Sequence, residues 1–260
     1  MNEAPKRLLG PTDPEPVTVD NANGTSPFLL VADHAGNLIP RTLGRLGLGD
    51  PDLQRHIGWD IGIAGLGRLL SDALDAVLIR QNYSRLVIDA NRPPGSAASI
   101  PEVSELTPVP GNLGLDEAGK AARAREIFWP YHERIEAELE SRRRSGRPTV
   151  LIALHSFTPI FKGVARPWHV AVLYNRDPRL AQSLLALLKR QSGLIVGDNE
   201  PYFVSDATDY TIPVHGERRA LHHALIEIRQ DLIAEEKGQR DWAALLADLL
   251  PAAHAAVGKG

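Results

Sequence analysis

The stretch that most constrains the fold is an apolar run, Phe28–Ala32, which ends on the polar pair Asp33-His34. A continuous apolar run of this length predicts a buried strand, and Gly36 permits a sharp turn after it. Side chains that follow such strands in α/β proteins face the crevice where ligands bind. His34 and Asn37, three residues apart, are therefore candidate site residues. A structural interpretation, in which these polar groups only satisfy the local backbone, remains open.

The rest of the chain alternates apolar segments with segments of helical periodicity. We predict strands at 17–19, 28–32, 76–80, 86–88, 149–154, 168–174, 194–196 and 224–229. We predict helices at 60–75, 116–144, 179–191 and 239–257. This alternation favours an α/β fold with a mixed, mainly parallel sheet and helices on both of its faces. No repeat or linker divides the sequence, so we expect a single domain over residues 1–260, with an extended lead-in at 1–24.

The composition argues against several classes of protein. The chain has 260 residues, 43% of them hydrophobic, and a formal net charge of −3, which gives no indication of nucleic-acid or anionic-membrane binding. It contains no cysteine, which excludes disulfides, thiol catalysis and cysteine-ligated zinc. We recognise neither a secretory signal nor a segment of transmembrane length. We therefore expect a cytoplasmic protein without nucleic-acid or membrane partners.

Polar residues end four of the predicted strands. They are Asp33-His34, Asp89–Arg92, His155-Ser156 and Glu227–Arg229. The carboxyl ends of parallel strands meet at one edge of a sheet, so these groups can converge. Imidazoles and carboxylates are what a hydrolytic zinc site needs, namely nitrogen ligands, an open position for water and a carboxylate base. The sequence has neither a glycine-rich phosphate loop nor a Gly-x-Ser-x-Gly elbow, which argues against a serine hydrolase.

Five motifs in order resemble those of the N-formylglutamate amidohydrolase family. They are DHAGNLIP at 33–40, HIGWDIG at 56–62, SRLVIDANR at 84–92, LHSF at 154–157 and IEIR at 226–229. The resemblance implies a metal-dependent amidohydrolase that cleaves an N-formyl or related N-acyl amino acid. The most concrete reaction is that of N-formylglutamate to formate and glutamate, as in histidine degradation. The resemblance also implies a divalent metal, first of all zinc, and a small-molecule substrate that is an acylated acidic amino acid.

The family is similar in fold to the zinc carboxypeptidases. This implies a three-layer α/β/α architecture with a mixed, mainly parallel central sheet, of the zinc-exopeptidase type. By the same resemblance, His34 and His155 match metal ligands, and Glu227 matches the catalytic base.

The substrate-binding residues follow from one further match. The segment Asp89–Arg92 resembles the carboxypeptidase Asp-x-Asn-Arg sequence that binds the substrate carboxylate. Asn91 and Arg92, with Arg85 nearby, are therefore expected to bind substrate. Guanidinium groups bind carboxylates through paired hydrogen bonds, and two arginines suit a substrate with two carboxylates. An ordinary ion-pair role for both arginines is the alternative.

One position departs from the carboxypeptidase pattern. Asn37 stands where those enzymes have a metal-ligating Glu, and an amide oxygen is a poorer zinc ligand than a carboxylate. Either Asn37 completes the metal shell weakly, or another carboxylate joins it. Asp60 and Asp33 are the candidates, of which we favour Asp60. The alternative role of Asp60 is as the N-cap of the helix that follows.

Four other residues are secondary candidates for the site. His56 and His215 lie near the expected site loops, although a structural role is open for both. Tyr210 suits a loop that closes over the substrate, or a packed aromatic position. Arg229 completes the last motif.

Two alternatives to the N-formylglutamate reaction remain open at this stage. One is a related zinc carboxypeptidase or amidase that acts on peptides, which would need a longer pocket. The other is a non-catalytic binding protein on the same scaffold, which the Asn37 departure keeps open. The oligomeric state is not predicted.

Overall fold

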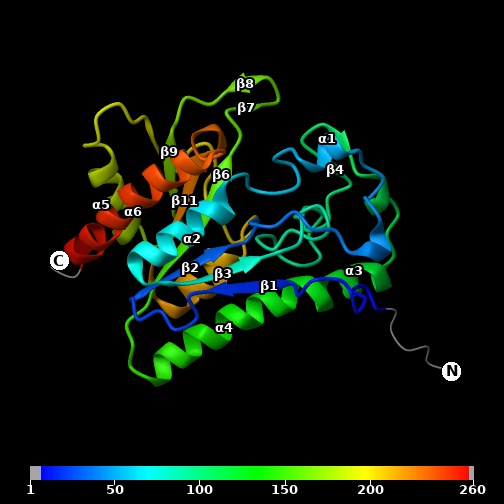
Figure 1. Cartoon of the computed structure of the whole chain (residues 1–260), viewed down its shortest axis with the longest axis horizontal. Helices are drawn as coiled ribbons and strands as arrows, with labels where there is room; N and C mark the ends of the chain where they lie inside the picture. Colours follow the sequence, from blue (N-terminus) through cyan, green and yellow to red (C-terminus); the bar gives the residue numbers. More distant parts are fainter. Residues whose placement is uncertain (1–6, 258–260) are drawn as a thin grey trace.

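The computed structural model describes residues 7–257 and shows one seven-stranded sheet with helices packed on both faces (Figure 1). The strands of this sheet are β1 (Val17–Asp20), β2 (Phe28–Ala32), β3 (Val77–Gln81), β6 (Val150–Phe157), β9 (Val170–Leu173), β10 (Val196–Asp198) and β11 (His222–Arg229). Two small hairpins stand outside it, β4–β5 (Val103–Ser104 and Thr107–Pro108) and β7–β8 (Ile160–Phe161 and Val164–Ala165).

The sheet is mixed and mainly parallel. Its strand order is β1-β3-β2-β6-β11-β9-β10. Four of the six neighbouring pairs are parallel, and the antiparallel ones are β1 with β3 and β11 with β9. The central strands β2 and β6 are buried along their whole length, which explains why both read as uninterrupted apolar runs. This confirms the predicted α/β/α fold class.

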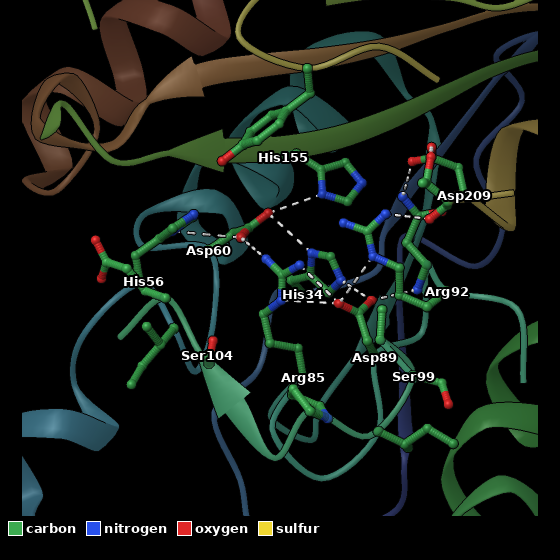
Figure 2. A pocket seen from close by; sticks show the side chains of 18 of the residues that line it. His34, His56, Asp60, Arg85, Asp89, Arg92, Ser99, Ser104, His155 and Asp209 are labelled. Carbon is green, nitrogen blue, oxygen red and sulfur yellow. Dashed lines mark hydrogen bonds and ion pairs between the residues drawn. The ribbon is translucent and has the colours of Figure 1, made fainter. Parts of the chain in front are cut away.

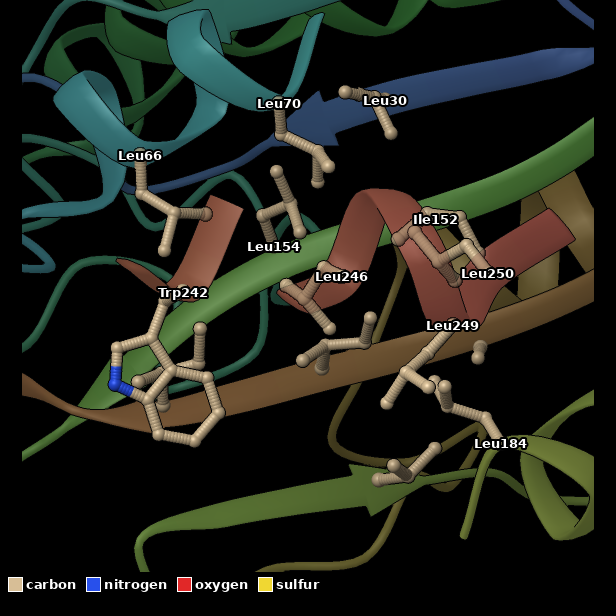
Figure 3. Close-up of a cluster of buried hydrophobic side chains, with 14 of the residues drawn as sticks. Leu30, Leu66, Leu70, Ile152, Leu154, Leu184, Trp242, Leu246, Leu249 and Leu250 are labelled. Carbon is tan, nitrogen blue, oxygen red and sulfur yellow. The ribbon is translucent and has the colours of Figure 1, made fainter. Parts of the chain in front are cut away.

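Helices cover the two faces of the sheet separately. One layer contains α2 (Ile63–Leu74), α5 (Arg179–Leu188) and α6 (Glu236–Val257), and the other contains α4 (Trp129–Arg144) (Figure 1). Successive strand residues point to opposite faces. Leu30 therefore packs in the first layer with Leu66 and Leu246 (Figure 3), whereas Val31 packs in the second layer beneath α4.

The long helix predicted at 116–144 is interrupted. It consists of α3 (Glu117–Arg123), a π-helical turn (Ala124–Phe128) and α4, and Asp116 caps its first turn through a hydrogen bond from the Gly119 amide. Pro130 lies in the first turn of α4. Because proline has no amide hydrogen to donate, the ladder of helical hydrogen bonds is disturbed just before it.

The prediction of a strand at Leu86–Ile88 is wrong. The segment is buried, but it forms a turn. Two buried side chains take the place of a neighbouring strand: the Asn112 amide donates to the Leu86 carbonyl at 2.9 Å, and the Arg123 guanidinium donates to the Val87 carbonyl at 2.9 Å. An apolar run shows that a segment is buried, but it does not show what satisfies the backbone.

The other predicted strands and helices exist, with ends that differ by a few residues. Within the predicted lead-in, β1 pairs with β3, and residues 1–6 lie outside the described part. Over 7–257, no helix is long and apolar enough to cross a membrane.

Candidate active site

Three segments that follow or form strands meet at one edge of the sheet. His34 comes just after β2, His155 lies in β6, and Glu227 lies in β11 directly beside His155 in the parallel register. Asp60 comes from the turn before α2, and its amide donates to the His34 carbonyl at 2.8 Å. This backbone bond places the Asp60 carboxylate next to both imidazoles (Figure 2).

His34, Asp60 and His155 form the one group in residues 7–257 whose ligand atoms are spaced to hold a metal ion. The Nδ1 atoms of His34 and His155 lie 3.5 Å and 3.0 Å from Asp60 Oδ2. Two of the atoms in the group, His34 Nδ1 and Asp60 Oδ1, are buried without a hydrogen-bond partner. Two imidazoles and one carboxylate, with a further position open, are a typical donor set for a catalytic zinc ion. The residues present therefore fit a divalent metal.

Outer carboxylates hold the far side of both imidazoles. Asp89 Oδ1 lies 2.6 Å from His34 Nε2, and Asp33 Oδ2 lies 3.0 Å from His155 Nε2. The Thr211 hydroxyl donates to the other Asp33 oxygen at 2.7 Å. Carboxylates that accept the outer N–H of a histidine orient its ring and direct the other nitrogen at a metal. Here both Nδ1 atoms are directed at Asp60.

The acidic groups of the site are held in their charged form. Burial opposes ionisation of Asp33, but its hydrogen bond to His155 lowers its pKa to about 2. Burial also opposes ionisation of Asp89, and Arg85 and His34 hold its pKa well below the usual value. Burial disfavours protonated His155, yet Asp33 and Asp60 raise its pKa well above 6.5. The charged carboxylates thus favour positive charge beside them, as protons on the imidazoles or as a metal ion between the two rings.

Glu227 differs from the other carboxylates of the site. It is 7% exposed, and its Oε2 atom is buried without a hydrogen-bond partner. Burial raises its pKa to about 7, with the Asp60 charge adding to this effect and His155 opposing it. A carboxylate with a pKa near neutrality is suited to accepting and returning a proton.

Asp60 and Asn37 have separate positions in the structure. Helix α2 begins at Ile63 with Gly62 as its N-cap and without a side-chain cap, so Asp60 does not cap it. The Asn37 amide nitrogen donates to the Leu53 carbonyl, and Asn37 is outside the His34–Asp60–His155 group. Asp60 and Asn37 were both candidates for the third ligand. In the structure, the Asp60 carboxylate lies beside His34 and His155, and the Asn37 amide does not belong to this group.

The expected substrate-binding residues differ in how freely they face the cavity. Asn91 is committed to the protein: its amide donates to Asp209 at 3.1 Å, and its oxygen accepts from two backbone amides. Arg85 pairs with Asp89 at 2.8 Å and lies 3.6 Å from Asp60. The Arg92 side chain is 29% exposed and donates a hydrogen bond to the Thr208 carbonyl (Arg92 is labelled in Figure 2). Arg92 is thus the most accessible of the three.

The four secondary candidates fall in different places. His56 lines the cavity with its Nδ1 3.7 Å from Asp60 Oδ1, and burial lowers its pKa to about 4. His215 is buried behind the site, where its Nε2 lies 2.9 Å from His132 Nδ1. Tyr210 packs against the His132 ring, with 4.5 Å between ring centroids. Arg229 ends β11 and pairs with Asp231 at 2.8 Å.

A cavity of about 1390 Å³ opens above the His34–Asp60–His155 group. Its floor includes His34, Asp60, His155 and Glu227. Its wall comes from loops and the two small hairpins, mainly in segments 94–105, 158–161, 201–203 and 208–209. Sequence patterns do not single out Tyr202 in this wall, because its loop carries no strand-end pattern. Asp89 stood within a recognised motif, but its support of His34 follows only from the structure.

A buried His-Asp-His group beside a free carboxylate, at the edge of an α/β sheet, is the kind of site that a hydrolase uses. A family model of N-formylglutamate amidohydrolase matches residues 26–234. The chain belongs to the N-formylglutamate amidohydrolase family and is a hydrolase that acts on amide C–N bonds. This confirms the resemblance drawn from the five motifs.

Two solved structures share the fold of this chain. A gene product of Agrobacterium tumefaciens is 37% identical and superposes with a TM-score of 0.94, over 97% of this chain and 100% of that one. An N-formylglutamate amidohydrolase from Ralstonia eutropha JMP134 is 20% identical, with a TM-score of 0.63 over 92% of this chain and 97% of that one, and shows the shared fold. A comparison with curated protein sequences found no match.

Proposed function

We propose that this protein is a metal-dependent amidohydrolase that removes the formyl group of an N-formyl amino acid, most concretely N-formylglutamate, to give formate and glutamate. The observation that carries the proposal is the geometry of the floor. Two histidines, each oriented by an outer carboxylate, direct their free nitrogens at Asp60, and Glu227 stands unpaired beside them. Membership of the family supports the choice of reaction.

His34, Asp60 and His155 would hold the metal. A bound divalent metal supplies Lewis acidity toward the formyl oxygen and lowers the pKa of water near it. Glu227 accepts a proton from the attacking water and returns it to the departing amine, for which its pKa of about 7 is suited. Asp33 and Asp89 keep the two imidazoles oriented during this transfer.

Arg92 would bind a carboxylate of the amino acid. It is the accessible arginine of the 89–92 segment, and a bidentate guanidinium contact fixes the substrate relative to Glu227. Arg85 and Asn91 act behind it, because Arg85 is paired with Asp89 and Asn91 ties this segment to residues 209–211.

The test combines metal analysis with an activity assay. Protein purified without chelator should contain about one divalent metal ion per chain, and removal of that ion should abolish formate release from N-formylglutamate. Readdition of zinc, manganese or cobalt should restore it. Absence of metal together with no rescue by any of the three would instead favour a binding protein.

The size of the cavity favours one second candidate, an amidase or carboxypeptidase of peptides. At about 1390 Å³ the cavity is larger than typical small-molecule pockets of roughly 300–1,000 Å³. A panel of formyl, acetyl and peptidyl substrates separates the two reactions. Preference for a peptide over N-formylglutamate by kcat/KM would replace the first proposal with the second.

A further inference from the structure

A buried arginine has no part in the chemistry described above. Arg166 directly follows the β7–β8 hairpin and is 8% exposed. Among residues 7–257, no carboxylate forms an ion pair with it, and its Nη1 atom is buried without a hydrogen-bond partner. Removing a guanidinium from water without a counter-charge is costly. Such an uncompensated cation is expected where an anionic ligand supplies the missing partner.

Aromatic rings surround the Arg166 guanidinium. Its central carbon lies 4.5 Å from the centroid of Phe161, 4.7 Å from Tyr202 and 5.9 Å from Phe157. Aromatic rings attract a guanidinium through their π faces, but they carry no negative charge that would replace a carboxylate partner. The rings therefore orient this arginine without neutralising it.

The position of Arg166 connects it to the reaction centre. It lines a small hollow that shares Phe161 and Pro201 with the main cavity. Tyr202, whose ring centroid is close to the Arg166 guanidinium, lines the main cavity itself. Burial and the nearby Glu227 charge raise the pKa of the Tyr202 hydroxyl, whereas Arg166 lowers it. The Tyr202 hydroxyl is thus within electrostatic range of both the Glu227 carboxylate and the Arg166 guanidinium.

The backbone around Arg166 is anchored, which limits its freedom to move away. Its amide donates to the Pro159 carbonyl at 2.8 Å, and its carbonyl lies 3.5 Å from Arg229 Nη1 at the end of β11. β11 also carries Glu227. The hollow and the catalytic strand are therefore joined through Arg229.

The other cations that line the main cavity each have a carboxylate nearby. Within the described chain, each lysine or arginine that lines the main cavity has a carboxylate within 4.0 Å: Arg55, Arg85, Arg92 and Lys120. In the adjoining hollow, Lys162 and Arg166 lack one among the described residues, and Arg166 is the buried one of the two. A second anionic group of a bound ligand is thus expected to reach the Arg166 hollow.

We propose that Arg166 is the residue that selects a substrate with two carboxylates, by binding the side-chain carboxylate of the amino acid while Arg92 binds the other. The reaction class in this statement rests on the proposed function. The binding of a dicarboxylate does not, so the two can fail separately.

The principal variant is Arg166→Met, which keeps an unbranched apolar stem between the rings and removes the charge. Its kcat/KM for N-formylglutamate should fall by about 100-fold, as expected for the loss of a charge-assisted contact. With N-formylglutamine, which has no side-chain charge, it should change by less than about threefold by the same argument. Arg166→Lys should retain part of the preference. Arg190→Met, at an exposed position away from the cavity, is the matched control and should behave as the wild type.

Binding measured without turnover completes the test. By calorimetry, the wild type should bind glutarate more tightly than butyrate, and Arg166→Met should lose that difference. An equal loss of activity with both formyl substrates, an unchanged preference, or equal binding of glutarate by wild type and variant would each overturn the role of Arg166. If the wild type hydrolyses neither formyl substrate, the proposed function fails while the glutarate result still decides this proposal. If Arg166→Met does not fold, Arg166→Lys decides it by the same measurements.

Discussion

The floor and the wall of the cavity are built in opposite ways. On the floor, His155 lies in a strand, His34 follows one closely and Asp60 lies in a turn bonded to His34. A carboxylate contacts each imidazole from both sides. The wall comes from loops and from two hairpins whose strands have two residues each. It exposes apolar side chains such as Val103 and Phe203.

The difference separates chemistry from selection. Groups that must meet at one point are held by the buried sheet, where the backbone has little freedom, whereas groups that distinguish ligands lie on loops. Changes on the floor are therefore expected to affect turnover of every substrate. Changes in the wall are expected to affect the choice between substrates.

The largest expected effect is at Glu227 on the floor. Glu227→Gln should lower kcat by about three orders of magnitude, because the amide cannot accept the proton from water. Metal content should not change, since Glu227 is not part of the His34–Asp60–His155 group. The measurements are kcat with N-formylglutamate and metal analysis of the same preparation. Near-normal turnover would remove Glu227 from the mechanism.

The next effect, in the wall, concerns Arg92. Arg92→Ala should lower kcat/KM by about two orders of magnitude through the loss of a bidentate contact to the substrate. The melting temperature should barely change, because the side chain is 29% exposed and its nearest carboxylate contact is long, at 3.8 Å. Arg92→Lys should recover only part of the activity. A large drop in melting temperature with intact kcat/KM would make Arg92 a structural residue.

A smaller effect tests the outer support of the floor. Asp89→Asn should weaken metal binding by about 10- to 100-fold, because it removes the charge that orients His34. Asp33→Asn is the matched variant at His155 and should have a comparable effect. Competition with a chelator measures both affinities. Unchanged affinity in both variants would contradict the view that these carboxylates hold the imidazoles for a metal.

The smallest expected effect is on stability and concerns the buried histidine pair behind the site, His132 and His215. Burial is the main reason that the pKa of His132 lies at about 4 and that of His215 at about 3. The neighbouring His132 and Arg219 lower the pKa of His215 further, and Asp33 opposes the shift of both histidines. An unfolded histidine binds its proton near pH 6.5, so between pH 6.5 and about 4 the unfolded chain holds more protons and stability falls as pH falls.

Lowering the pH from 7.5 to 5.5 should therefore cost about 1 kcal/mol of unfolding free energy for each of these histidines. Urea denaturation at the two pH values measures this cost. His215→Gln should show a smaller difference between the two pH values than the wild type, whatever its absolute stability. An equal difference in both proteins would show that His215 does not titrate on unfolding.

Sequence patterns located the sheet and all seven of its strands because buried strands must be apolar along their length. They also singled out His34, His155 and Glu227, since each follows or ends such a run. They were wrong at Leu86–Ile88, where Asn112 and Arg123, 24 or more residues away, satisfy the backbone. Periodicity describes burial of a segment, and it carries no information about a partner so distant in the chain.

What the sequence by itself determined is therefore the α/β class, the family and the residue types at the ends of the strands. The sequence favoured Asp60 as a ligand but left Asn37 open, and the tertiary structure shows the Asp60 carboxylate beside both imidazoles, where the Asp60 amide bonds to the His34 carbonyl. The tertiary structure alone placed Arg166 among three aromatic rings beside the cavity. A strand can be predicted because the burial of a segment determines its own residue types. The positions of Asp60 and Arg166 depend instead on contacts with segments that are distant in the chain.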